Sequence, residues 1–167
     1  MEPDSVVALR QLGIERLRAN AFVEAIALLA RAVTAEPDEP TTQLNLGIAL
    51  QGVDRHAEAL KLFASVQKLL PDDPAAFLHA ALSFLHLGQA SAALSAASEA
   101  CHRAPGVAQT HYVYGQAWLA MSEPGKAERA FAEAIRLAPL SADAWVNYGI
   151  ARYRQGAIEE AKTAMRQ

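Results

Sequence analysis

Four prolines divide this chain at equal intervals. Pro37, Pro71, Pro105 and Pro139 each stand 34 residues from the next, and each closes a similar phrase: RAVTAEP, SVQKLLP, EACHRAP and EAIRLAP. A spacing held over three intervals predicts tandem structural repeats. We place full repeats at 6–39, 40–73, 74–107 and 108–141 and an incomplete fifth at 142–167, which together make one domain over 1–167.

Small and large residues recur at fixed positions of this repeat. The eighth residue is Gly13, Gly47, Ala81, Gly115 and Gly149, the twentieth is always alanine, and the twenty-fourth is large in four repeats (Leu29, Phe63, Phe131 and Met165). Small residues let two antiparallel helices approach closely, and proline ends the second helix because it cannot continue the hydrogen-bond ladder. We expect first helices near 6–18, 41–53, 75–87, 108–120 and 142–154, and second helices near 21–35, 55–69, 89–103, 123–137 and 157–167.

Local signals mark the ends of these helices. Tight turns within the pairs are expected at Asn20, Gly88, Ser122 and Gly156. Glu39 and Asp73 each precede a proline, an order that suits the first turn of a helix.

Composition excludes several classes of protein. With 52% apolar residues, 7% aromatics and roughly one alanine in five, the chain is typical of packed helices and not of a disordered tail or a β-sandwich. A net charge of -3 argues against general binding to nucleic acid. One cysteine excludes a disulfide framework and a cysteine-rich zinc site. No apolar run is long enough for a membrane span, and the acidic start lacks a secretory signal, so we expect a cytoplasmic location.

These residues resemble the tetratricopeptide repeat (TPR) family, whose 34-residue pattern is W-x2-L-G-x2-Y, then A-x3-F, A and P. Trp145 with Tyr148-Gly149, and Tyr114-Gly115 with Trp118, come nearest to it, whereas repeat 3 departs most. The resemblance covers residues 6–167. The chain is similar to the TPR arrays of O-GlcNAc-transferase-like enzymes and of bacterial TPR scaffolds. It implies an all-α, right-handed superhelical solenoid of about 4.5 to 5 repeats, with first helices along a concave face.

Catalytic and metal-binding patterns are missing from the sequence. His79 and His86 stand seven residues apart without nearby carboxylate or cysteine help, so we expect no metal site. Cys101 is followed by His102, but a nucleophile needs its base across space, and we therefore interpret Cys101 as a small buried hydrophobe. Glycines 13, 47, 115 and 149 are interpreted as packing residues, not as phosphate loops. We predict no cofactor and no enzyme activity.

Function is therefore expected on the exposed face of the first helices, which the resemblance places in a groove. An amide at the sixth position can grip a peptide backbone, as in O-GlcNAc-transferase arrays, and Asn45 and Asn147 fit that role best. Val113 and Gly52 are assigned to the same face. The predicted peptide-binding residues are Arg10, Gln11, Ile14, Asn45, Ile48, His79, Leu82, Tyr112, Gln116, Asn147 and Ile150.

Two points stay open from the sequence. The aliphatic stripe of Ile14, Ile48, Leu82 and Ile150 either binds a partner or packs against neighbouring helices. The charge-poor second helix of repeat 3 is either a contact surface or a tightly packed element. The predicted function is a protein- or peptide-binding scaffold or adaptor. The alternatives are the substrate-recruiting arm of a larger enzyme, such as a glycosyltransferase, and a self-assembling scaffold with homo-oligomeric contacts.

Overall fold

The computed structural model describes residues 5–164 and 166, and within them every regular element is an α-helix. The predicted ranges are confirmed to within about two residues at the helix ends that the structure describes, although α10 is described only as far as Ala164. The helices are α1 (Val6–Arg18), α2 (Phe22–Ala35), α3 (Pro40–Gln51), α4 (His56–Leu69), α5 (Pro74–His86), α6 (Ala90–Arg103), α7 (Ala108–Ala120), α8 (Pro124–Leu137), α9 (Ala142–Arg154) and α10 (Ile158–Ala164).

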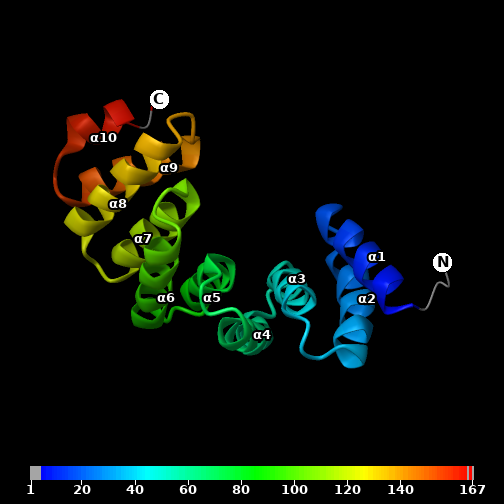
Figure 1. The fold of residues 1–167 in the computed structure, drawn as a ribbon. Coiled ribbons are helices and arrows are strands. Elements are labelled where there is room, and N and C mark those ends of the chain that lie inside the picture. Colours follow the sequence, from blue (N-terminus) through cyan, green and yellow to red (C-terminus); the bar gives the residue numbers. More distant parts are fainter. Residues whose placement is uncertain (1–4, 165, 167) are drawn as a thin grey trace. The chain divides into compact units, whose positions relative to one another are not determined.

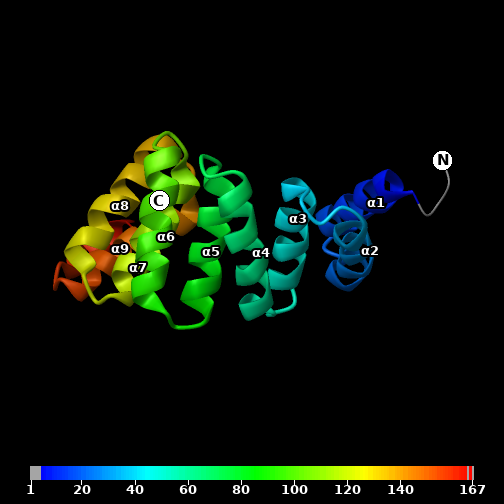
Figure 2. The same ribbon diagram turned by 60° about the horizontal axis from the view of Figure 1, so that its bottom comes forward.

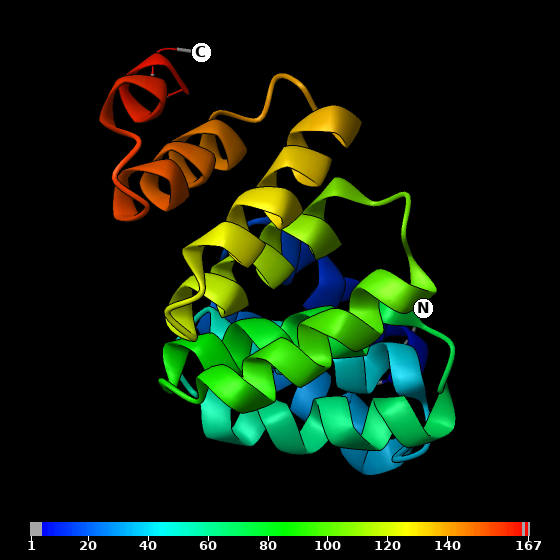
Figure 3. The same cartoon turned by 90° about the vertical axis from the view of Figure 1, so that its left-hand side faces the viewer.

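The chain divides into two compact units within α5, between Ser83 and Phe84. In the first unit α1 packs on α2, α2 on α3 and α3 on α4, as the helices labelled α1 to α4 in Figures 1 and 2 show. In the second unit each helix from α6 to α10 packs on the next, and Figure 3 shows α10 (red) beside α9 (orange). The helix pairs within the units are thus α1 with α2 and α3 with α4 in the first, and α7 with α8 and α9 with α10 in the second.

Three helix pairs close around a glycine that faces a large side chain. A methyl group on Gly47 would lie 2.4 Å from the ring of Phe63, and one on Gly115 would lie 2.5 Å from the ring of Phe131. Gly13 meets Leu29 in the same way, at 2.7 Å. Since Leu29, Phe63 and Phe131 are fully buried, no space is left for a larger residue at the glycine. The predicted role of the eighth and twenty-fourth positions is confirmed in these three pairs.

The turn inside every pair uses the same backbone conformation. Asn20, Asp54 and Ser122 have φ of 56°, 58° and 59°, and Gly88 and Gly156 have φ of 69° and 85°. All five stand at the fifteenth position of their repeat. The turns expected at Asn20, Gly88, Ser122 and Gly156 are confirmed, and Asp54 completes the set. Glycine, asparagine and aspartate visit this left-handed region most readily.

Side-chain donors at the fourth position hold the connection between repeats. The Trp145 indole N–H donates to the carbonyl of Pro139 at 2.9 Å, and His111 Nε2 donates to the carbonyl of Pro105 at 2.8 Å. Gln43 donates to the carbonyl of Pro37 in the same way. The last carbonyls of a helix lack partners within the helix, so a side chain six residues later satisfies a carbonyl just beyond its end. The residue pattern of the repeat gives no indication of this bond.

Alanine dominates the packing of α6. Ala93, Ala96, Ala97 and Ala100 are buried, while the serines between them are exposed. This burial favours the interpretation of the charge-poor helix as a tightly packed element over its interpretation as a contact surface.

The carboxylates expected at helix N-termini are also confirmed, because Glu39 accepts from the Thr41 and Thr42 amides and Asp73 accepts from the Ala75 amide.

The contact between Gly115 and Phe131 predicts a stability effect. Gly115→Ala should lower the free energy of unfolding by about 1–3 kcal/mol, since the new methyl group overlaps a fully buried ring. Urea denaturation followed by circular dichroism measures the change. Gly125→Ala is the control, because its methyl group would meet only Gln155 Oε1 at 3.5 Å. It should leave stability unchanged or raise it by up to about 1 kcal/mol. Equal effects of both substitutions would contradict the packing role.

Candidate functional site

In the first unit, the predicted basic group is already paired. Arg10 on α1 forms an ion pair with Glu36 and lies 3.8 Å from Glu39 through its Nε atom. Burial raises the pKa of Glu39, but hydrogen bonds from Thr42 and the nearby Arg10 charge outweigh it, so the net pKa is lowered. Arg10 therefore stabilises the connection that leads into α3, and its positive charge is balanced inside the chain.

Asn45 and His79, from α3 and α5, are oriented by neighbouring groups. The amide N–H of Asn45 donates to the Thr41 carbonyl one turn earlier, at 2.8 Å. His79 Nδ1 lies 2.9 Å from Gln51 Oε1, and the amide N–H of Gln51 donates to the His79 carbonyl at 2.8 Å. The His79 ring stacks on Phe63 with centroids 5.7 Å apart. Burial lowers the pKa of His79, so this histidine is neutral near pH 7.

In the second unit, three predicted residues form one polar cluster. The amide N–H of Asn147 on α9 donates to the Tyr112 hydroxyl at 3.1 Å, and the amide N–H of Gln116 donates to the same oxygen at 3.2 Å. Asn147 also donates to the Asp143 carbonyl at 2.9 Å. Burial and the Asp143 charge raise the pKa of Tyr112, partly offset by the bond from Asn147, so its hydroxyl keeps its proton. We call Tyr112, Gln116 and Asn147 the amide cluster.

The aliphatic residues of the predicted face are neither core nor fully exposed. Ile14, Ile48, Leu82 and Ile150 are all half-buried, and Gln11 is exposed. One assignment to this face is wrong. Val113, at the sixth position of repeat 4, is fully buried in the second unit. Gly52 is exposed, although a methyl group there would lie 2.4 Å from the Phe22 ring.

A base across space from Cys101 does exist, which the sequence could not show. Cys101 Sγ on α6 lies 4.0 Å from His111 Nδ1 on α7. His111 Nε2 carries the proton that it donates to the Pro105 carbonyl, so Nδ1 is free to accept from the thiol. However, burial raises the pKa of Cys101, and a bond with Thr110 offsets this only in part. The group is therefore a thiol near neutral pH and lacks the lowered pKa of a catalytic cysteine.

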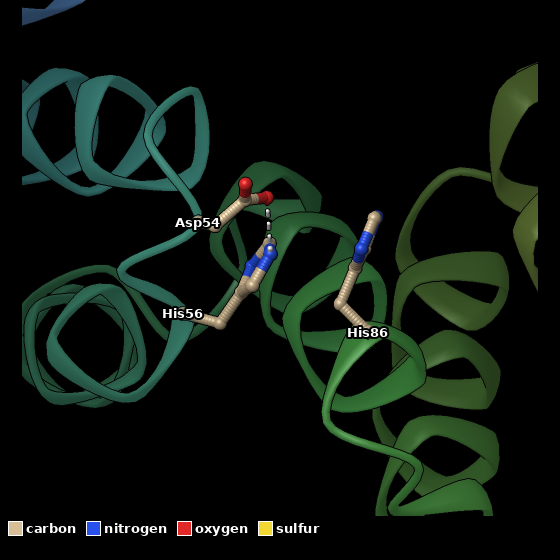
Figure 4. Close-up of side chains that lie close together, drawn as sticks. All are labelled: Asp54, His56 and His86. Carbon is tan, nitrogen blue, oxygen red and sulfur yellow. Dashed lines mark ion pairs between the residues drawn. The ribbon is translucent and has the colours of Figure 1, made fainter.

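A second histidine contact lies at the turn between α3 and α4. His56 Nε2 is 3.6 Å from Asp54 Oδ1, and Figure 4 shows this pair as a dashed line. His56 is buried, whereas Asp54 is almost fully exposed. Asp54 is also the residue with φ of 58°, so the contact joins the left-handed turn to the start of α4.

Comparison with known proteins identifies the family. Two tetratricopeptide repeat models match residues 16–83 and 112–166. Among solved structures, a MamA fragment (41-end) from Desulfovibrio magneticus RS-1 has a TM-score of 0.86 at 23% identity and covers 98% of this chain and 92% of its own. TTC0263, a thermophilic TPR protein in Thermus thermophilus, has a TM-score of 0.81 at 18% identity and covers 96% of this chain and 88% of its own. No curated protein sequence matches this chain.

The protein is thus an all-α helical-repeat protein of the solenoid class. It belongs to the tetratricopeptide repeat family, as the residue pattern indicated. This membership supports a general role in protein interaction. None of the helices within the described residues is long and apolar enough to cross a membrane.

The environment of Cys101 predicts slow chemical modification. Only the thiolate reacts with iodoacetamide, and a raised pKa moves the midpoint of the reaction to higher pH than for an ordinary thiol. Cys101 is the only cysteine, so the rate of modification of the whole chain reports on it. The same chain unfolded in concentrated urea is the control and should react faster at pH 7.5. A midpoint in the folded protein below that of the unfolded protein would instead indicate an activated cysteine.

Proposed function

We propose that this protein is a non-catalytic scaffold that binds an extended segment of a partner protein along the exposed face of its first helices. The residues proposed to bind are those predicted from the sequence, and the amide cluster of the second unit supports the assignment most directly. The cytoplasmic location expected from the sequence stays a prediction.

The hydrogen bonds of the amide cluster leave a specific set of groups unused. The Tyr112 oxygen accepts from both Asn147 and Gln116, which fills its two acceptor positions and leaves its own O–H to donate outward. The two donors of the Asn147 amide are engaged by Tyr112 and by the Asp143 carbonyl. Its carbonyl oxygen has no hydrogen-bond partner among the described residues, nor does that of Gln116. The cluster therefore offers one donor and two acceptors on adjacent first helices.

This set of groups matches a peptide backbone. An extended peptide presents alternating N–H donors and C=O acceptors, so it can donate to Asn147 and Gln116 and accept from Tyr112. Ile150 lies one turn along α9 from Asn147 and is half-buried, which suits an anchor for an apolar side chain of the partner. The amide N–H of Asn147 is held by two acceptors, so its orientation is fixed before binding and less conformational entropy is lost.

The first unit carries a related but simpler arrangement. The Asn45 amide is oriented by the Thr41 carbonyl, and its own carbonyl oxygen is left for a ligand. Arg10 is engaged by Glu36 and Glu39, so it adds no free charge for an acidic peptide tail. This pairing favours recognition of the peptide backbone over recognition of a terminal carboxylate.

The combined substitution Tyr112→Phe and Asn147→Ala tests the amide cluster. Peptides that bind the wild-type protein are selected from a displayed library of random dodecapeptides, and their affinity for each variant is measured by fluorescence anisotropy. Loss of one outward donor and one acceptor should weaken binding roughly tenfold, with helicity unchanged. Ser98→Ala is the control, because Ser98 is exposed on α6, a second helix, and so lies off the proposed face. Selected peptides that bind the double variant as tightly as the wild type would exclude this face.

A further inference from the structure

Three hollows in this protein lie at the same place in three different repeats. Each is lined by the seventh and eleventh residues of the repeat, which lie on its first helix, and by the nineteenth and twenty-second residues of the repeat, which lie on its second helix. Their volumes are about 310 Å³ in repeat 2, 400 Å³ in repeat 4 and 600 Å³ in repeat 5. These four positions are Leu46, Leu50, Glu58 and Lys61 in repeat 2, Tyr114, Trp118, Lys126 and Arg129 in repeat 4, and Tyr148, Arg152, Glu160 and Thr163 in repeat 5.

The repeat-4 hollow lies on another face of α7 than the amide cluster. Tyr114 and Trp118 stand two residues after Tyr112 and Gln116 respectively, and residues two apart on an α-helix point about 200° apart. One helix therefore separates the two surfaces. A ligand of the hollow does not compete for the groups proposed to bind a peptide backbone.

Two aromatic rings form the floor of the repeat-4 hollow. Tyr114 and Trp118 pack edge to face with ring centroids 5.6 Å apart, and both are half-buried. Trp118 also packs against the core around Ala127 and Phe131, which holds its ring in place. A rigid aromatic floor of this kind suits an aromatic side chain, because aromatic pairs contribute beyond the area they bury.

The rim of the repeat-4 hollow is basic. Lys126 Nζ lies 4.5 Å from the centre of the Trp118 ring and 3.6 Å from exposed Glu123. Arg129 is exposed, and no ion pair within the described residues engages it. Glu133 also lines the hollow, but Arg136 donates to both of its carboxylate oxygens, at 2.9 Å and 2.6 Å. The guanidinium of Arg129 is therefore available to a carboxylate, with Lys126 beside it.

The other two hollows differ in the same two rim positions. In repeat 5 the residues equivalent to Lys126 and Arg129 are Glu160 and Thr163, so these two positions carry no basic group there. In repeat 2 they are Glu58 and Lys61, and the floor is aliphatic. Arg55 donates to both carboxylate oxygens of Glu58, each at 2.7 Å. Among these three hollows, only the one in repeat 4 has two aromatic residues in its floor and a cationic residue at each of the two rim positions.

We infer that the repeat-4 hollow is a second docking surface, for an acidic peptide segment that carries one aromatic side chain. The aromatic side chain rests on Tyr114 and Trp118. A flanking carboxylate pairs with Arg129, which can bind it through two parallel N–H bonds. Lys126, held by Glu123 and over the Trp118 ring, adds positive charge at the rim. The charge of the rim selects this occupant over a basic or a purely apolar segment.

The test uses a fluorescein-labelled peptide, Asp-Asp-Phe-Asp-Asp, titrated with the whole chain and followed by fluorescence anisotropy. Saturable binding is expected, weakened about tenfold by Arg129→Glu because one attraction becomes a repulsion. Lys61→Glu is the matched control, since Lys61 stands at the equivalent position of repeat 2 and carries the same charge change. It should leave the affinity unchanged. Affinity should also fall as ionic strength rises, because the rim is solvent-exposed.

Three results would overturn the inference. These are no saturable binding to the wild type, equal weakening by Arg129→Glu and Lys61→Glu, and equal binding of the peptide with alanine in place of phenylalanine. The double variant Tyr112→Phe and Asn147→Ala should bind this peptide as the wild type does. This measurement separates the two surfaces. Library peptides could fail to bind the amide cluster while Asp-Asp-Phe-Asp-Asp still binds the repeat-4 hollow.

Discussion

The contact between a glycine on one helix and a large buried side chain on its partner fixes the geometry of this protein. Gly47 with Phe63 and Gly115 with Phe131 bring two helices so close that a single added methyl group has no room. Side chains on either helix then point in set directions, because rotation about the helix axis would move the glycine away from the ring. The amide cluster and the repeat-4 hollow both inherit their positions from this contact. They lie on different faces of α7, and the contact of Gly115 fixes the orientation of α7 about its own axis.

The fold followed from the sequence because its signals repeat. One proline or one glycine is weak evidence. Prolines at 34-residue intervals, with alanine at the twentieth position of every repeat, place all ten described helices to within about two residues at their described ends. The bond from the fourth position of the repeat to the proline carbonyl is not apparent from the sequence, because its donor differs between repeats: an amide in Gln43, an imidazole in His111 and an indole in Trp145. Their shared chemistry is an N–H, which no single residue type encodes.

The site was less predictable than the fold, and for a physical reason. Helical periodicity indicates which residues share a face, but it does not indicate what each side chain contacts. Arg10 was expected to meet a ligand, but no pattern indicated that it pairs with Glu36, a residue 26 positions away. Val113 was expected on the exposed face and is fully buried. The bond between Tyr112 and Asn147 joins two neighbouring first helices, so it depends on how one repeat stacks on the next, which no pattern within a single repeat describes.

The alanine-based packing of α6 bears on how the protein responds to temperature. Ala93, Ala96, Ala97 and Ala100 fill positions where many helical proteins use leucine, so each residue buries less apolar area. The heat capacity change on unfolding grows with the apolar area exposed, and for typical proteins it is about 12–15 cal/mol/K per residue. The four alanines of α6 therefore contribute less to this heat capacity change than leucines at the same positions would. Replacing them with larger apolar residues would make the stability of the protein depend more steeply on temperature.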